Sequence, residues 1–258
     1  MPLGESFFLL CSLRSFAAIP NTRKTRRRFV SGIHNKGFVY GEQFSIDFRR
    51  MNVGRPRLSQ SIANIKRKAE RRLRAICKRD PKFLAEGLLA ASRLIAAKTN
   101  RADWPRLNPK IHVNDMMYEG HPTGYFLSSY SALSCIRTAL DKADKKSILS
   151  VLDFGCGHGR ILRALAANFP EAALTAVDTN KSGVNFCAKE FGAKPVYSNY
   201  AFSNLAFDRK FDLIWVGSVF THLSGERWIP LLRLLRSLLA EGGLLLFSTH
   251  GRDAEKVA

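Results

Sequence analysis

The feature that most constrains this chain is a strand, a glycine-rich loop and a helix that follow one another within residues 148–169. An apolar run rich in branched side chains is typical of a buried parallel strand, and it ends at Asp153. Three alternate positions then hold Gly155, Gly157 and Gly159. A pattern of helical spacing begins at Ile161. Because glycine lets the backbone turn sharply and lets a ligand approach bare peptide groups, this layout predicts a nucleotide-binding βα turn.

The spacing of the glycines separates this loop from two other phosphate-binding loops. A dinucleotide-binding loop has the pattern G-x-G-x-x-G, and the position that would complete it is Arg160. The P-loop pattern G-x-x-x-x-G-K-[ST] does not occur in the sequence. What remains, Asp-x-Gly-x-Gly-x-Gly after a strand, resembles motif I of the class I S-adenosylmethionine-dependent methyltransferases. The alternative is a tight turn between two core elements, since glycine loops are common.

The residues after this loop continue the alternation of strands and helices. A second apolar run ends in an acid, Asp178, roughly 20 residues downstream, where a carboxylate can bind ribose hydroxyls. Further strands are expected at 196–197, 211–216 and 243–248, and helices at 181–191 and 227–240. This order predicts an α/β fold with a doubly wound parallel sheet and a ligand crevice at the carboxyl ends of its strands.

The resemblance to class I methyltransferases extends over residues 111–251 and implies a Rossmann-like sheet and S-adenosylmethionine as the cofactor. By resemblance, Asp153 and the first two glycines would line the methionine end of the cofactor, and Asp178 would bind the ribose. Cys156 is expected to fill space in the turn, where a small side chain is needed. The cofactor-binding residues implied in this way are Asp153, Gly155, Cys156, Gly157, Gly159, Asp178, Thr179, Asn199 and Tyr125.

Two members of this set depend on weaker parts of the resemblance. Ser198 or Asn199 would lie near the adenine, but the family usually has an acid there. Residues 115–117 and 124–125 resemble the lid segment that precedes motif I in bacterial small-molecule members, so Tyr125 is expected to cover the cofactor.

The end of the sequence departs from the family pattern. The family completes its sheet with a sixth and a seventh strand, and residues 252–258 are too few to form them. We therefore expect a sheet truncated after its fifth strand, with the strand order 3-2-1-4-5. Residues 243–248 would then form an exposed edge strand.

The methyl acceptor is expected beside residues 217–222, which follow the predicted 211–216 strand. This segment lacks the Asn/Asp-Pro-Pro-Tyr signature for amines of nucleic-acid bases, the Pro-Cys nucleophile for cytosine, and an acidic cluster for a metal. By elimination the acceptor is a small molecule, with oxygen favoured over nitrogen and no metal. The expected reaction is methyl transfer to a hydroxyl. The alternatives are an RNA methyltransferase that uses the basic N-terminal region, and a non-catalytic cofactor-binding module.

His222 is the candidate catalytic base, because an imidazole titrates near neutral pH and this residue follows a strand tip. A structural histidine that orients the loop is the alternative. His250 and Tyr200 are lesser candidates, and His158, inside the glycine loop, is expected to point to solvent.

The positive charge of the chain lies almost entirely in its N-terminal part. Residues 1–110 contain 25 Lys and Arg against 7 Asp and Glu, whereas residues 111–258 contain 16 against 14. We therefore divide the chain into a basic, disordered extension (1–58), a basic helical hairpin (59–110) and a methyltransferase domain with an incomplete C-terminus (111–258).

The hairpin has features of packing and of charge. Ile62, Ile65, Ala69, Leu73 and Ile76 form one helical stripe among Lys and Arg residues. Asp80 and Pro81 predict the start of a second helix. One interpretation is a hairpin whose stripe packs on the methyltransferase core. The other is contact with an anionic surface, either a nucleic acid or an acidic membrane.

Cysteine use and hydropathy indicate a cytoplasmic protein. Five cysteines are scattered without C-x-x-C spacing, which argues against a disulfide framework or a zinc site. No apolar run approaches the roughly 20 residues of a membrane span. Residues 7–19 have some character of a secretion signal, but Glu5 precedes them and no basic segment does.

Overall fold

The computed structural model describes residues 8–12, 56–202 and 205–249, with side chains described from residue 63 onward. The chain divides into two compact units, with the boundary between Arg72 and Leu73, and the short strand at 8–12 belongs with the unit that follows Leu73. Among the described residues, no helix combines the length and the apolar character needed to cross a membrane.

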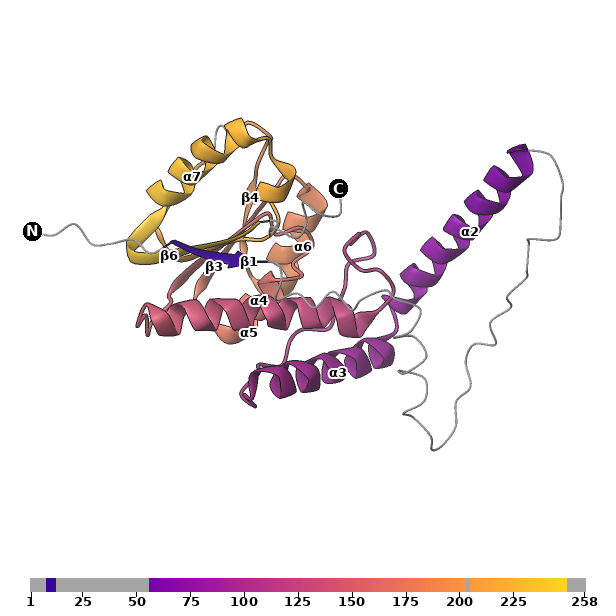
Figure 1. Ribbon diagram of the computed structural model, residues 1–258, viewed down its shortest axis with the longest axis horizontal. Helices are drawn as coiled ribbons and strands as arrows, with labels where there is room; N and C mark the ends of the chain where they lie inside the picture. Colours follow the sequence, from indigo (N-terminus) through magenta and orange to yellow (C-terminus); the bar gives the residue numbers. More distant parts are fainter. Residues whose placement is uncertain (1–7, 13–55, 203–204, 250–258) are drawn as a thin grey trace, which may run out of the picture. The chain divides into compact units, whose positions relative to one another are not determined.

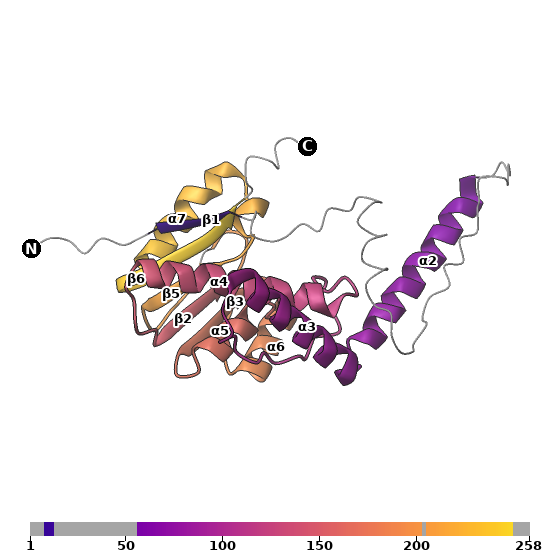
Figure 2. The same cartoon turned by 60° about the horizontal axis from the view of Figure 1, so that its bottom comes forward.

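A parallel sheet forms the centre of the larger unit (Figures 1 and 2). Its strands are β1 (Phe8–Ser12), β2 (Ser150–Phe154), β3 (Ala173–Asp178), β4 (Lys194–Tyr197), β5 (Phe211–Val216) and β6 (Leu239–Thr249). They lie in the order β1-β6-β5-β2-β3-β4, and every neighbouring pair is parallel. The five strands from β2 onward have the order 3-2-1-4-5, so the predicted doubly wound sheet is confirmed.

The position of β6 differs from the expectation. Residues 243–248 do not form an exposed edge, because β1 pairs with β6 in parallel, from Phe8 opposite Leu245 to Ser12 opposite Thr249. The prediction of an edge strand was wrong because an edge leaves a row of N–H and C=O groups unpaired, and an apolar segment distant in sequence can pair with it. Residues 250–258 lie outside the described residues.

Helices cover both faces of the sheet (Figure 1). The described helices of the whole chain are α2 (Pro56–Cys77), α3 (Pro81–Thr99), α4 (Pro122–Lys142), α5 (Leu162–Asn168), α6 (Lys181–Phe191) and α7 (Trp228–Ser237), with short 3₁₀ turns η3 (Phe220–His222) and η4 (Gly225–Arg227). Buried side chains of α4, α5 and α6 form one core with the sheet, whereas those of α7 form a core on the opposite face.

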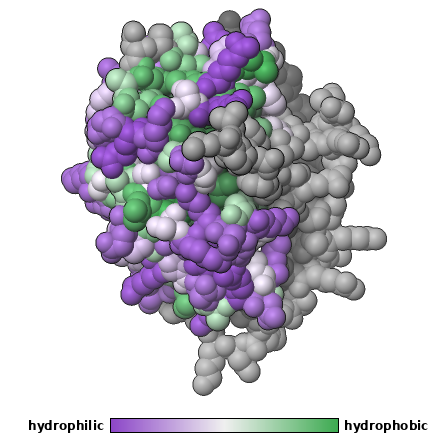
Figure 3. Space-filling model, turned by 90° about the vertical axis from the view of Figure 1, so that its left-hand side faces the viewer, coloured by the Kyte–Doolittle hydropathy of each residue, from purple (hydrophilic) through white to green (hydrophobic). Residues whose placement is uncertain are grey.

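Only a few side chains of α7 are buried against the sheet. Leu231 and Leu235 are fully buried, whereas Ile229 is exposed. Figure 3 shows the side of the molecule that faces left in Figure 1, where hydrophobic side chains are more frequent in the upper part, mixed with hydrophilic ones, and hydrophilic side chains predominate below. The upper part is the side on which Figure 1 places α7.

The two helices of the expected hairpin behave differently. Asp80 caps α3 as predicted, since its Oδ1 accepts hydrogen bonds from the backbone N–H groups of Lys82 and Phe83 at 3.0 and 3.1 Å. The α3 side chains that face inward, Leu84, Leu88 and Ile95 among them, are buried in a core shared with α4. The stripe of α2 is not buried: Ile65, Leu73 and Ile76 are 69%, 62% and 66% exposed. The interpretation of this stripe as a packing face was therefore wrong.

The contact between α3 and α4 gives a test of this packing. A Cβ at Gly87 would lie 2.5 Å from Cβ of Pro122 and 3.0 Å from the backbone nitrogen of Thr123, whereas a Cβ at Gly124 would meet nothing within 4 Å. Gly87→Ala should lower the free energy of unfolding by about 1–3 kcal/mol through overpacking, although alanine favours a helix. Gly124→Ala, the matched control in α4, should leave it unchanged or raise it by up to about 1 kcal/mol. Urea unfolding of both variants measures the difference, and equal effects would contradict this packing.

Candidate functional site

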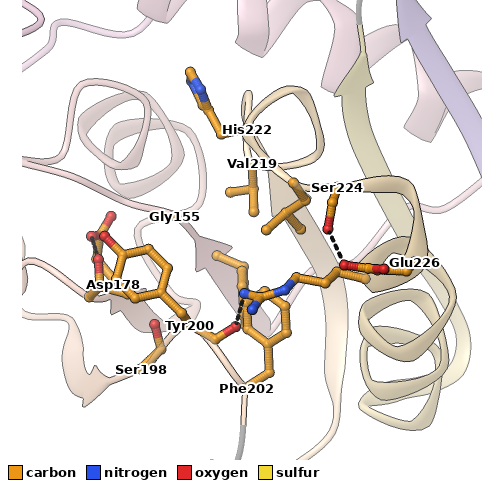
Figure 4. A pocket seen from close by; sticks show the side chains of 13 residues that line it. Gly155, Asp178, Ser198, Tyr200, Phe202, Val219, His222, Ser224 and Glu226 are labelled. Carbon is orange, nitrogen blue, oxygen red and sulfur yellow. Dashed lines mark hydrogen bonds between the residues drawn. The ribbon is translucent and has the colours of Figure 1, made fainter.

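Two adjoining cavities lie at the carboxyl ends of the central strands. The first, the Tyr200 cavity, has a volume of about 400 Å³ and is drawn in Figure 4. The second, the Asp153 cavity, has a volume of about 510 Å³. Both are lined by Gly155, Asp178, Val219 and His222. They therefore form a continuous site at the place where open α/β sheets bind their ligands.

The glycine loop is shaped by positive backbone angles and by close contacts. Gly155, Gly157 and Gly159 have φ of +87°, +51° and +75°. A Cβ at Gly155 would lie 2.3 Å from Cγ2 of Val219, and one at Gly159 would lie 2.4 Å from the ring of Phe191. At Gly157 the space is open, so only the backbone angle requires glycine there.

Gly183 also belongs to this loop's surroundings, although the sequence pattern did not single it out. A Cβ at this position of α6 would lie 2.1 Å from the carbonyl oxygen of Gly157. The first turn of α6 can therefore approach the loop only because residue 183 lacks a side chain. The sequence did contain a signal for this contact, because a glycine stands two residues after the start of the predicted 181–191 helix.

Asp178 connects the loop to the next strand. Its Oδ2 accepts a hydrogen bond of 2.7 Å from the backbone N–H of Gly157, and its Oδ1 accepts one of 2.8 Å from the N–H of Asn180. The carboxylate also borders both cavities. It thus fixes the loop and faces the space where a ligand would lie.

Asp153 is a buried carboxylate at the end of β2. Its side chain is 2% exposed, it lines the Asp153 cavity, and its Oδ2 has no hydrogen-bond partner among the described residues. Burial, together with the negative charge of Asp178, raises the pKa of Asp153 to about 8. A carboxylate in this state favours a positively charged group in the adjoining cavity.

Tyr125, which was expected to cover the cofactor, is a buried residue of α4. The residue is 3% exposed and lines neither cavity. Its hydroxyl donates a 2.6 Å hydrogen bond to Oδ2 of Asp115 and accepts one of 3.1 Å from Nη2 of Arg163. Burial raises the pKa of Tyr125 above its usual range. Asp115, from the same lid segment, does line the Asp153 cavity, so Tyr125 reaches the site only through it.

The expectation that His158 points to solvent was wrong. The side chain is 6% exposed and lines the Asp153 cavity. Its ring stacks on that of His112 with 4.6 Å between centroids, and burial lowers the pKa of His158. The turn at the flanking glycines directs this ring inward, which the sequence pattern alone could not reveal.

The candidate base His222 lies in η3 and lines both cavities. Its side chain is exposed, and no described side chain forms a hydrogen bond with its ring. In Figure 4 the imidazole points away from Asp178 and Tyr200. Tyr200 is 74% exposed and lines the Tyr200 cavity, whereas His250 lies outside the described residues.

The other predicted positions are divided between the cavities. Ser198 and Thr179 line the Tyr200 cavity, and Cys156 lines the Asp153 cavity. Gly159 and Asn199 line neither. A hydrogen bond with the neighbouring Cys187 thiol and burial raise the pKa of Cys156, so its thiol stays neutral. No cluster of His, Cys, Asp or Glu that could hold a metal occurs among the described residues.

Trp215 and Ser218 complete the Asp153 cavity. The sequence placed Ser218 in the expected acceptor segment but gave Trp215 no role in the site. The indole Nε1 of Trp215 is buried without a partner among the described residues. Ser218 has φ of +62°, a strained angle for a side-chain-bearing residue, and its N–H donates a 2.7 Å hydrogen bond to the hydroxyl of Ser248. All three residues line the cavity.

Comparison with known proteins assigns this part of the chain. Residues 152–245 match a family described as "Methyltransferase domain". Residues 152–245 therefore belong to a class I S-adenosylmethionine-dependent methyltransferase domain. The match includes the glycine loop, Asp178 and η3, but not the lid segment before residue 152.

The curated relatives of this methyltransferase domain are bacterial. The chain is 32% identical over 113 residues to a malonyl-[acyl-carrier protein] O-methyltransferase of Halalkalibacterium halodurans. The matched region covers 40% of this chain and 40% of that protein. It is 28% identical over 149 residues to the protein of the same name from Bacillus anthracis, covering 57% of this chain and 53% of that protein. The chain thus spans about half, or less, of the curated relatives it matches.

Solved structures resemble the chain more distantly. The plantazolicin methyltransferase BpumL in complex with SAH has 19% identity and a TM-score of 0.43, with 78% of this chain and 65% of that chain covered. A methyltransferase from Clostridium acetobutylicum has 23% identity and a TM-score of 0.39, with 44% and 47% covered.

The contact between Gly155 and Val219 can be tested in the methyltransferase domain. Gly155→Ala should lower the free energy of unfolding by about 2–4 kcal/mol, because a methyl group meets Cγ2 of Val219 at a positive φ. The double variant Gly155→Ala/Val219→Ala should recover about 1 kcal/mol or more of this loss, since the clashing atom is removed. Gly157→Ala, with open space at its Cβ, is the control and should not respond to Val219→Ala. A double variant no more stable than Gly155→Ala would contradict the proposed contact.

Proposed function

We propose that this domain transfers a methyl group from S-adenosylmethionine to an oxygen atom of a small-molecule acceptor. The observation that carries the proposal is the buried Oδ2 of Asp153, which lacks a hydrogen-bond partner among the described residues and lies beside the Asp153 cavity. This cavity shares Asp178 with the Tyr200 cavity. The cofactor, when bound, supplies an electrophilic methyl group on a positively charged sulfur, together with an ammonium group. The residues present fit such a molecule.

The two cavities fit the two ends of the cofactor. Asp153 would stabilise the positive charge of the methionine end, in agreement with its raised pKa and lack of a partner. Asp178, which borders both cavities, would accept hydrogen bonds from the ribose hydroxyls. The nucleoside would then occupy the Tyr200 cavity, beside Ser198 and Phe202.

We further propose that the acceptor oxygen belongs to a carboxylate and not to the hydroxyl expected from the sequence. The relatives are named for O-methylation of a malonyl group, which carries a free carboxylate. A carboxylate is ionised at neutral pH and needs no general base, whereas a hydroxyl needs one. His222 is exposed and lacks an orienting partner among the described side chains, as a residue without a base role would. The guanidinium of Arg160, which lines the Asp153 cavity, is suited to orient a carboxylate.

Asp153 predicts a pH dependence of cofactor binding. Since the pKa of the free protein's Asp153 is raised to about 8, this group is protonated at lower pH and must lose its proton to pair with a cation. The affinity for S-adenosylmethionine should therefore rise by up to about tenfold per pH unit between pH 5 and pH 7, where the ammonium of the free cofactor keeps its charge. Calorimetry in buffers of different ionisation enthalpy should detect the released proton.

Asp153→Asn should remove this dependence and the proton release. Asp208→Asn, at an exposed carboxylate that pairs with Lys194, is the matched control and should change neither. An affinity that is independent of pH in the unmodified protein would contradict the role given to Asp153.

A substitution at His222 distinguishes a carboxylate acceptor from a hydroxyl acceptor. With a carboxylate acceptor, tested as the malonyl thioester of N-acetylcysteamine, His222→Gln should change kcat by less than about threefold. With a hydroxyl acceptor, tested as a phenol of similar size, the loss of a general base should lower kcat about 100-fold or more. The release of S-adenosylhomocysteine measures both rates. Turnover of the phenol alone, lost in His222→Gln, would overturn the carboxylate proposal and restore the hydroxyl.

A further inference from the structure

Helix α2 carries a dense positive charge on its surface. Between residues 63 and 76 it has six basic side chains and one acidic one, Glu70, and all seven are exposed. The basic residues are Lys66, Arg67, Lys68, Arg71, Arg72 and Arg74. No ion pair between two described residues involves any of the six. Within the described part of the chain, this positive charge is therefore not neutralised by ion pairs.

The same helix exposes an apolar stripe. Ile65, Leu73 and Ile76 are 69%, 62% and 66% exposed, and at about 100° per residue they fall within about 80° of the helix circumference. Helices that pack on a protein core use a wider apolar face, of about 100° or more. The narrow, exposed stripe therefore fits shallow contact with an apolar layer better than burial in a protein core.

Basic residues border the stripe on both sides. Lys66 follows it on one side and Arg72 on the other, each about 20° beyond its edge on the helix circumference. Long basic side chains at such positions can lie along an apolar surface while their charged ends reach anionic groups above it. Apolar side chains below and a row of cations above match the cross-section of an anionic lipid surface.

We propose that α2 binds the surface of an anionic lipid membrane, with Ile65, Leu73 and Ile76 inserted between the lipid head groups and the basic residues paired with lipid phosphates. RNA would satisfy the charge but gains nothing from an exposed aliphatic stripe, because its binding by basic residues is electrostatic. A second copy of α2 would bury the stripe but bring two strongly basic helices together. Of these three partners, only the anionic membrane accounts for both features of the helix. The inference is independent of the reaction proposed above.

The test is flotation of the full chain with vesicles of phosphatidylcholine alone and of phosphatidylcholine with phosphatidylglycerol at about 70:30. The protein should float with the anionic vesicles at least about tenfold more than with the neutral ones, and less as salt is raised from about 0.05 to 0.5 M. Ile65→Ser/Leu73→Ser/Ile76→Ser keeps the charge and should lower binding to anionic vesicles about tenfold or more. Lys66→Gln/Arg67→Gln/Arg71→Gln/Arg72→Gln keeps the stripe and should lower it by a similar factor.

Ala63→Ser, about 80° outside the edge of the stripe on the same helix, is the matched control and should bind within about twofold of the unmodified protein. Thermal unfolding of each variant, unchanged within error, confirms that the α/β domain is intact. Binding to anionic vesicles that does not fall in the triple serine variant would overturn the proposal. So would micromolar RNA binding that survives in that variant while vesicles are not bound, or a dimer that the serine variant converts to a monomer.

Discussion

The hydrogen bond between the Asp178 carboxylate and the backbone N–H of Gly157 is the interaction on which the arrangement of the site depends. It joins the end of β3 to the middle of the glycine loop, two segments brought together by the parallel pairing of β2 and β3. The N–H groups of Gly155 and Cys156 add to this link by donating to the carbonyl of Val177. The loop is therefore held by one side chain and one backbone carbonyl of β3, and its position follows from the sheet and not from its own side chains.

This arrangement leaves Asp153 with an electrostatic cost. Its pKa in the folded protein lies above the ordinary value, so its contribution to stability is fully present below about pH 4 and is lost as the pH rises towards 8. Nearby Asp178 increases this cost, because two carboxylates at one site repel each other. A cation bound between them would offset both effects. In the proposed binding mode, the electrostatic cost of ionising Asp153 would thus favour a positively charged ligand.

The sequence predicted the parts of the fold whose signal is local. The strand before Asp153, the three glycines, the strand ending at Asp178 and the cap at Asp80 all depend on residues close together in the chain. Long-range partners were harder to predict. Periodicity identified an apolar stripe on α2 but could not say that its side chains are exposed, and it gave no sign that residues 8–12 pair with β6. The inward position of His158 depends on turns whose direction follows only from the three-dimensional backbone.

Arg163 explains why the lid segment belongs to the site even though it precedes the family match. The guanidinium is 1% exposed, which would be costly without partners. It donates hydrogen bonds to the carbonyls of Gly159, Asn108 and Lys110 and to the hydroxyl of Tyr125. These bonds connect the end of the glycine loop, residues 108–110 and α4. Through the bond from Tyr125 to Asp115, the same network reaches the Asp153 cavity. A change in the lid segment must therefore be felt by the glycine loop, because both satisfy the same buried charge.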